Sequence, residues 1–382
     1  MAIAGLFTSV ASAADLYVRE NGTGGAYSTV SAAITAAANG DRIIIQPKIT
    51  GAAYVENLTI NKSLTFMSET AYNKYFIKGT VTIVPAVGRV VNISNLSSGD
   101  FTINNITVSG PTTGGRTTLN IMNSYLNNVF VDQTNTTLNL SGCEVSGGVT
   151  FSHGKVTGNE IQYIRATAQV PDNSLATDDV MIIGNKVSMG ITNYQSSYAF
   201  KILNNFSTDI FIFLIKTGSD NEIINNTVYR PHDGDVAPIY ISLNQGNTGA
   251  ISVMNNAVSF VGFSDFGISN NSIATVTASY NIFTNSYYSE GVINSNNTGN
   301  ANMNFDAVNY TVMGMNENAG NPAVIYTDLD LTRNDAGHNG GSNSWENYWP
   351  VDAGGKPQVN YLVMPRIITG GTLNISGSGY SK

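Results

Sequence analysis

The sequence contains few of the residues on which many kinds of protein function depend. Charged residues make up 12% of its 382 positions, and there are three histidines, ten prolines and one cysteine. The single cysteine, Cys143, excludes an intrachain disulfide framework. The net charge of −8 argues against nucleic acid as a partner, because Lys and Arg on phosphates drive such binding. No apolar run approaches the roughly 20 residues that a membrane-spanning helix needs.

A short apolar run opens the chain and ends in Ala11-Ser12-Ala13, which matches the A-x-A pattern of signal-peptide cleavage sites. No Lys or Arg precedes this run, which departs from the usual signal-peptide pattern. We expect residues 1–13 to be a signal peptide. The mature protein is then expected to be secreted, in the extracellular medium or at the cell surface.

The chain does contain an internal repeat. Its six-residue motif has an apolar residue at the first position, Asn or Gly at the third, usually Asn at the fourth and usually an apolar residue at the sixth. Examples are "ILNNFS" (202–207) and "IINNTV" (223–228). We place the fourth position of the motif at Ser124, Cys143, Asn159, Asn185, Asn205, Asn226, Asn256 and Asn271. These positions lie about 21 residues apart on average, and variable loops account for the scatter.

Each repeat holds short β-branched runs bounded by Gly, Asn and Ser, which indicates strands. A coil of about 20 residues with three short strands can bring each strand back beside its copy in the preceding coil. The pattern predicts an all-β protein, built as a right-handed parallel β-helix with coils about 4.8 Å apart. At the fourth position we expect a buried structural ladder in which each Asn side chain bonds to its copy in the next coil. Its members are Cys143, Asn159, Asn185, Asn205, Asn226 and Asn256.

Both ends of such a helix need covering, because an open coil exposes unpaired strand edges. Residues 29–38 are predicted to form an N-terminal capping helix. Its cap is Ser28 or Thr29, its apolar stripe is Val30, Ala33, Ile34 and Ala37, and Gly40 stops it. We expect the β-helix with this cap to occupy residues 14–300. The asparagine pattern fades after residue 300, so residues 301–382 are expected to form the last coils and an irregular C-terminal cap.

Several stretches resemble a known superfamily. "ADLYVRENGTGGAYSTVSAAITAAANGDRIIIQP" with "YVENLTINKSLTF" is similar to the opening of pectin-lyase-like right-handed β-helix proteins. "DLDLTRNDAGHNGG" and "VNYLVMPRIITGGTLNISGSG" resemble the closing segments of a secreted, Bacteroidetes-type subset of these repeat proteins. The resemblance covers roughly residues 15–380 and implies the fold. The superfamily includes pectate lyases, polygalacturonases, alginate epimerases, phage tailspikes and members without demonstrated enzyme activity.

The stretch "VYRPHDGDVA" (228–237) concentrates ionisable groups in the longest gap between repeats. Its Pro-His-Asp segment resembles the Asp-Pro-His-Asp motif of mannuronan epimerases. The resemblance implies that His232 and a carboxylate, Asp233 or Asp235, exchange the sugar's proton next to its carboxyl group. Arg230 stands where that motif has Asp. Because of this departure we expect an exposed loop in which Arg230 pairs with Asp233 or Asp235, and in which His232 is not a catalytic base.

A calcium-dependent lyase site would need two or three carboxylates on neighbouring coils with an Arg or Lys base beside them. Asp178, Asp179 and Asp209 adjoin the repeat motifs and are candidates for such carboxylates. No lyase motif surrounds Arg165 or Arg230. Of the polygalacturonase motifs only the paired Asp178-Asp179 is present, so both readings are weak.

Oxygen donors and aromatic rings gather in residues 326–350. Asp328, Asp330, Asn334 and Asp335 have the density of a calcium-binding loop, although their spacing does not match an EF-hand. The alternative is a polar end-cap in which Arg333 pairs with one of these carboxylates. Tyr326, Trp345, Tyr348 and Trp349 would either stack on sugar rings or pack over the last coil.

Two functions fit these observations. The one we favour is a secreted non-catalytic β-helix with a structural, surface or glycan-binding role, whose partner is a polysaccharide or cell-surface glycan. The other is a polysaccharide lyase or uronan epimerase acting on acidic polysaccharides. Geometry separates them, because an enzyme needs at least two carboxylates and one base from different coils near a shared point. The sequence does not decide whether the chain self-associates.

Overall fold

A computed structural model describes residues 13–70, 73–98, 105–109, 116–167, 179–243, 248–262, 266–286, 289–349, 358–363 and 375–380. All but the last position of the predicted signal peptide lies outside these ranges, as does Asp178. Within them, no helix has the length and apolar character needed to cross a membrane.

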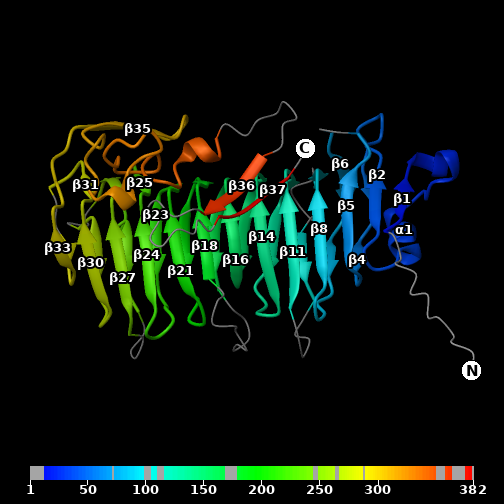
Figure 1. The fold of residues 1–382 in the computed structure, drawn as a ribbon, viewed down its shortest axis with the longest axis horizontal. Coiled ribbons are helices and arrows are strands. Elements are labelled where there is room, and N and C mark those ends of the chain that lie inside the picture. Colours follow the sequence, from blue (N-terminus) through cyan, green and yellow to red (C-terminus); the bar gives the residue numbers. More distant parts are fainter. Residues whose placement is uncertain are drawn as a thin grey trace, which may run out of the picture.

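Parallel strands stacked along one axis form the body of the molecule (Figure 1). The first column of strands is a 13-stranded parallel sheet. In spatial order its strands are β1 (Asp15–Val18), β2 (Arg42–Ile45), β5 (Leu64–Ser68), β8 (Val90–Ser94), β11 (Thr117–Met122), β14 (Thr136–Ser141), β16 (His153–Thr157), β18 (Asp179–Ile183), β21 (Ala199–Leu203), β24 (Asp220–Ile224), β27 (Ala250–Met254), β30 (Thr275–Ser279) and β33 (Ile293–Ser295).

A 20-stranded sheet supplies the other two strands of each coil. The second column holds β3 (Tyr54–Val55), β6 (Tyr75–Lys78), β9 (Leu96–Ser97), β12 (Tyr125–Leu126), β19 (Lys186–Val187), β22 (Phe206–Ser207), β25 (Thr227–Arg230), β28 (Ala257–Phe260) and β31 (Ile282–Phe283). The third holds β4 (Leu58–Ile60), β7 (Val81–Ile83), β10 (Asn105–Val108), β13 (Asn128–Val131), β20 (Gly190–Asn193), β23 (Asp209–Ile212), β26 (Ile239–Ile241), β29 (Ile268–Asn270) and β32 (Ser289–Glu290). The long strands β15 (Glu144–Phe151) and β17 (Glu160–Ala166) run through both columns, which completes the predicted parallel β-helix.

Alternate residues of each strand point inward and form one continuous core. In the first column the inward positions are paired in register and buried from coil to coil: Ile43, Phe66, Ile93, Ile121, Leu140, Val156, Ile182, Ile202, Ile223, Val253 and Ala278. Each coil buries its apolar residues against its neighbours, so the core grows along the axis rather than around a centre.

The asparagine ladder lies at the corner between the first and second columns. Asn205 Oδ1, for example, accepts from the backbone N–H of Asn185 at 3.0 Å and from its Nδ2 at 2.9 Å. The same pattern links Cys143, Asn159, Asn185, Asn205, Asn226 and Asn256 in one buried column, and continues to Asn281 and Asn297. The column is the predicted one, with one exception. Asn271 was placed wrongly, because it lies in the turn after β29, and Asn281 is the ladder residue of that coil.

The residue before each ladder position makes the turn itself. Its φ is positive, between 46° and 65°, at Asn95, Asn123, Gly142, Gly158, Gly184, Asn204, Asn225, Asn255, Tyr280 and Asn296. Gly and Asn adopt this left-handed conformation at least cost. The motif is therefore a doublet, in which the first residue turns the chain and the second bonds to the next coil.

A short helix, α1 (Val30–Ala36), covers the N-terminal coil, preceded by η1 (Glu20–Gly25). Thr29 Oγ1 accepts from the backbone N–H of Ala32, and Glu56 accepts from those of Val30 and Ser31 at 2.9 Å. Lys62 Nζ donates to the carbonyl oxygens of Ile34, Thr35 and Ala37 at the other end. The helix is shorter than the predicted range 29–38. The charged side chains of Glu56 and Lys62 satisfy the free backbone N–H groups at its start and the free carbonyl oxygens at its end.

Residues 301–349 return along the side of the β-helix (Figure 1). They hold the antiparallel pair β34 (Met303–Asp306) and β35 (Thr311–Gly314), η2 (Val324–Tyr326) and η3 (Trp345–Asn347). A second antiparallel pair, β36 (Gln358–Val363) and β37 (Ser376–Tyr380), follows. Residues 301–349 are termed the lateral cover.

Candidate functional site

The turning residues of the ladder corner hold the lateral cover in place. Asn204 Nδ2 donates to the carbonyl oxygens of His338 at 3.0 Å and Gly340 at 2.6 Å. Asn225 Nδ2 donates to the carbonyl oxygen of Asp335 at 2.8 Å. Where the turning residue is Gly184, the ring of Tyr348 occupies the space, and a Cβ there would lie 2.4 Å from it. The cover therefore follows the corner from coil to coil.

The predicted sugar-stacking aromatics are used mainly for this docking. Trp345 is buried and its Nε1 donates to Asn204 O at 2.6 Å, while Trp349 Nε1 donates to Gly184 O at 2.9 Å. The ammonium of Lys186 lies 4.0 Å from the ring centre of Trp349 and 5.7 Å from that of Trp345. Such cation–π contacts are stronger when desolvated. Burial lowers the pKa of Lys186.

The fourth predicted aromatic, Tyr326, ends η2 and is half-buried. Its carbonyl oxygen accepts from Asn334 Nδ2 at 2.6 Å. Trp345, Tyr348 and Trp349 contact the coils of Gly158, Gly184 and Asn204, so the predicted packing over the last coil is wrong. The cover reaches these coils because it runs backward along the helix.

The cover itself holds a buried histidine that the sequence did not single out, where it packs on the β-helix. His338 Nδ1 is 2.7 Å from Thr227 Oγ1, and its ring centre lies 4.3 Å from that of Trp345. Burial, with a smaller effect of Lys186, lowers the pKa of His338 to about 3. The imidazole is therefore neutral near pH 7 and serves as a polar packing element.

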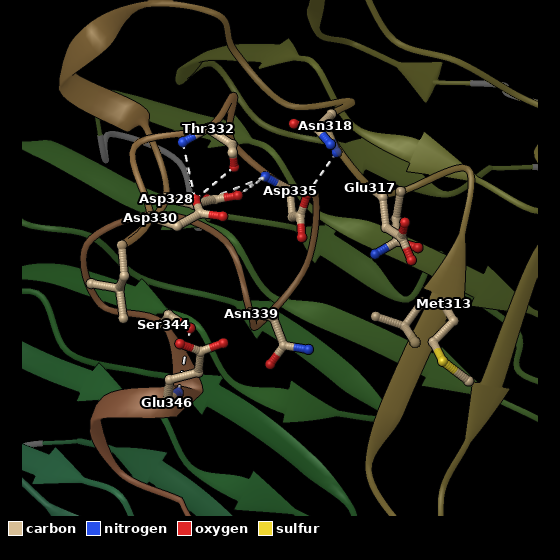
Figure 2. A pocket seen from close by; sticks show the side chains of 13 residues that line it. Met313, Glu317, Asn318, Asp328, Asp330, Thr332, Asp335, Asn339, Ser344 and Glu346 are labelled. Atoms are coloured by element: carbon tan, nitrogen blue, oxygen red, sulfur yellow. Dashed lines mark hydrogen bonds between the residues drawn. The ribbon is translucent and has the colours of Figure 1, made fainter.

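The cover also encloses an acidic pocket of about 360 Å³ (Figure 2). Its carboxylates are Glu317, Asp328, Asp330, Asp335 and Glu346, and none of the described residues that line it is basic. Three of the four predicted calcium ligands meet here. Asn334 does not line the pocket, because its side chain is buried between Asn225 and Tyr326.

Most of these carboxylates are already bonded within the cover. Asp328 accepts from the backbone N–H groups of Gly341 at 2.6 Å and Asp335 at 3.0 Å. Burial raises the pKa of Asp328 to about 6, and it also raises the pKa of Asp335. Repulsion from neighbouring carboxylates adds to both shifts. Across the part of the chain that the structure describes, no group of three or more His, Cys, Asp or Glu side chains is placed to hold a metal ion.

Arg333 bonds to backbone carbonyl oxygens, whereas the alternative interpretation of the sequence paired it with one of these carboxylates. Its Nε donates to the carbonyl oxygen of Gly320 at 2.8 Å and its Nη2 to that of Ala319. The guanidinium thus holds the loop that precedes η2.

A second hollow, the outer groove, lies on the outward face of the third column. It has a volume of about 400 Å³ and is lined by Tyr163, Ile164, Arg165, Ser188, Met189, Gly190, Thr192, Thr208, Asp209, Phe211 and His232. Parallel register places Arg165, Thr192, Phe211 and Tyr240 opposite one another in successive coils. Their neighbours in each strand point into the core, so this row faces outward.

The stretch "VYRPHDGDVA" contributes His232 to the lining of the groove. Arg230 is 2% exposed, and its Nη1 donates to Asp209 Oδ1 at 3.0 Å and its Nη2 to Val236 O at 2.8 Å. The predicted pairing of Arg230 with Asp233 or Asp235 is wrong, because the guanidinium turns inward to the carboxylate of the preceding coil. His232, Asp233 and Asp235 are exposed, and of these only His232 lines the groove.

Aromatic rings adjoin the groove and form the outer aromatic cluster, Tyr194, Phe211, Phe213 and Tyr240. Tyr194 is 39% exposed and stacks on Phe213 with ring centres 4.7 Å apart and planes at 9°. Phe211 lies 6.3 Å from Phe213 and 6.2 Å from Tyr240. The guanidinium of Arg165 lies 5.7 Å from the Tyr194 ring centre. The cluster gives this face a broad aromatic surface beside a hollow.

Comparisons of the chain with protein-family models, with curated proteins and with solved structures gave no match. The geometry of the two hollows is therefore the basis for assigning a function.

Proposed function

We propose that this protein is a secreted, non-catalytic β-helix of the pectin-lyase-like kind that binds a glycan chain in the outer groove. The observation that supports the proposal most is the outer aromatic cluster beside a hollow that crosses several coils. The apolar faces of sugar rings pack on aromatic side chains, while their hydroxyls bond to polar groups such as Asp209 and Thr192.

A glycan is favoured over a small apolar ligand because the groove is open and extends along the stacking direction. Each successive coil offers an outward side chain at the same register position, from Arg165 through Thr192 to Phe211. A polymer can follow such a row from coil to coil and contact each of these side chains in turn. The rings of the lateral cover are less suitable, because they contact Gly184, Asn204 and Lys186.

The carboxylates of the groove argue against catalysis. Asp209 is the one carboxylate among the described residues that line it, and Arg230 is bound to it at 3.0 Å. A catalytic acid or base must exchange a proton with the substrate, whereas the Oδ1 of Asp209 already accepts from the guanidinium of Arg230. We therefore expect the groove to bind a sugar chain without cleaving it.

A second candidate is a uronan lyase or epimerase, and one observation favours it. Tyr163 and Arg165 of β17 line the same groove as His232, which comes from a later coil. The guanidinium of Arg165 would offset the charge of a uronate carboxyl group. His232 or Tyr163 would then remove the proton beside that carboxyl group. The two candidates differ in what happens to the bound polymer.

Affinity electrophoresis through gels that contain neutral or acidic polysaccharides would test the proposal. We expect at least one polysaccharide to retard the wild type. The double variant Tyr194→Ala/Phe211→Ala should bind about tenfold more weakly or not at all, which is about 1.4 kcal/mol or more. Tyr125→Ala is the control, because Tyr125 is exposed on the second column. Equal retardation of all three proteins would argue against the groove as the binding site.

A further inference from the structure

The lateral cover carries an unusual share of exposed apolar side chains. Seven of the nineteen large apolar side chains that are exposed in the described ranges belong to it, although the cover is only about a sixth of the described residues. They are Val308, Met313, Met315, Val324, Ile325, Leu329 and Leu331. Leu331 is 73% exposed and held at a φ of 69°, a conformation that leucine rarely adopts. Exposed apolar groups that gather in one segment mark interaction surfaces.

Two of these side chains, Met313 and Leu329, line the acidic pocket (Figure 2). Leu331 lies between Asp330 and Thr332, which also line it. Apolar contact surface and negative charge therefore occur at one place on the cover. A ligand that binds here must present apolar groups and a positive charge together.

The polar lining of the pocket consists largely of hydrogen-bond acceptors. Besides its carboxylates it includes Asn316, which is 3% exposed and whose Oδ1 has no hydrogen-bond partner among the described residues. A buried acceptor without a donor is costly, and a donor that enters the pocket could satisfy it. The missing chemistry is a cationic donor such as an ammonium or guanidinium group.

We propose that the acidic pocket and the apolar residues around it form a docking surface for a polypeptide segment that carries Lys or Arg next to apolar side chains. The basic group enters the pocket between Glu317 and Glu346, and its apolar neighbours pack on Met313 and Leu331. A bare metal ion fits less well, because no three acidic side chains converge at coordination distance in the described structure. A free polyamine would use the charge but not the apolar surface.

Fluorescence anisotropy with three labelled five-residue peptides tests the proposal: Leu-Lys-Leu-Lys-Leu, Leu-Glu-Leu-Glu-Leu and Gly-Lys-Gly-Lys-Gly. We expect the first to bind the full-length protein most tightly. Its affinity should fall about tenfold or more in Glu317→Gln/Glu346→Gln and in Met313→Ser/Leu331→Asn. Asn is chosen at position 331 because it tolerates the left-handed backbone. The control Glu144→Gln/Glu290→Gln removes two exposed carboxylates from the β-helix and should bind like the wild type.

Several results would overturn the docking surface. Failure of the first peptide to bind, or equal binding of the Leu-Glu peptide, would remove the role of charge. Equal binding of the Gly-Lys peptide, or equal weakening in the control variant, would indicate general counter-ion attraction. If calcium chloride alone raised the melting temperature of the wild type but not of Glu317→Gln/Glu346→Gln, and no peptide bound, the pocket would be a metal site.

Discussion

Two neighbouring residues have different roles at each corner of this β-helix. The second residue of the doublet, such as Asn205, points inward and bonds to the coils on both sides. The first, such as Asn204, has a φ of 54° and points outward to the lateral cover. One residue type serves both roles because its amide donates and accepts, and because asparagine tolerates the left-handed backbone.

Removal of a ladder amide is expected to destabilise the fold strongly. Asn205→Ala leaves the backbone N–H and Nδ2 of Asn185 and the carbonyl oxygen of Ile182 without their partner. Each such buried group costs about 1–3 kcal/mol, so we expect a loss of at least about 2 kcal/mol in unfolding free energy. Urea denaturation measures it. Asn296→Gly, at an exposed turn with a φ of 55°, should change stability by less than about 0.5 kcal/mol.

The ladder could be predicted from the sequence because Asn recurs as the second residue of the doublet. The prediction failed where a doublet occurs away from the ladder corner. Asn270-Asn271 is a doublet, yet Asn270 bonds to Ala274 O and Gly291 O at the end of the third column. The ladder residue Asn281 follows Tyr280, which adopts the left-handed turn without being Asn or Gly. Only the strand register separates these cases, and register depends on contacts between coils.

Acidification should loosen the contact between His338 and the coil of Thr227. Burial lowers the pKa of His338 to about 3, whereas an unfolded histidine titrates near 6.5. Between about pH 6.5 and pH 3 the unfolded chain binds a proton that the folded chain does not, so stability falls as pH falls. Asp328 acts in the opposite direction, because its raised pKa of about 6 lets the folded state take up a proton first.

Denaturant midpoints between about pH 7 and pH 4.5 measure both effects. His338→Asn should lose less stability over this range than the wild type, and Asp328→Asn should lose more. The other strongly buried histidine, His153, has its pKa lowered to about 3 by burial and by Arg116, and contributes equally to all three proteins. Identical pH profiles for the three proteins would show that neither group titrates as its surroundings imply.

At the scale of elements, the lateral cover could not be placed from the sequence. Its contacts join residues more than 130 positions apart, such as Asn204 with His338 and Gly340, and no periodic pattern marks such pairs. The capping helix was easier to predict, because Thr29 and the apolar stripe that follows it lie within ten residues. Its start is bonded by Glu56 and its end by Lys62, which the fold brings in from the segments after β3 and β4.

A methyl group at Gly184 should displace the cover. A Cβ at this position would lie 2.4 Å from Tyr348 Cδ2, and the φ of Gly184 is 65°. Gly218→Ala is a matched control, because Gly218 has a φ of 74° and nothing within 4 Å of its Cβ position. Both variants share the cost of a left-handed alanine, so the difference between them reports the contact with Tyr348.

Limited proteolysis followed by mass spectrometry would detect that displacement. We expect Gly184→Ala to be cleaved within residues 301–349 several times faster than Gly218→Ala and the wild type. Equal cleavage rates in the two variants would mean that the ring of Tyr348 does not hold the cover.

At the scale of the whole molecule, stacked coils turn distant residues into neighbours on one face. Asp209 and Arg230 are 21 positions apart and form an ion pair, and Tyr163 reaches the same groove from an earlier coil. The sequence identified His232 and Arg230 as chemically interesting but assigned Arg230 the wrong partner. A charged residue in a solenoid finds its partner one coil away as readily as in its own loop, and the loop lengths that set this register leave no local signal.

The central claim is that the outer groove binds a polymer and leaves it intact. The direct measurement is the chain length of a retained polysaccharide, followed by size-exclusion chromatography during incubation with wild type and His232→Ala. The account predicts equal binding by both proteins, with a chain length that stays constant and no rise in the ultraviolet absorption of unsaturated sugars. Shortening of the polymer by the wild type together with a rise in that absorption, both about 100-fold slower with His232→Ala, would contradict it and establish a lyase.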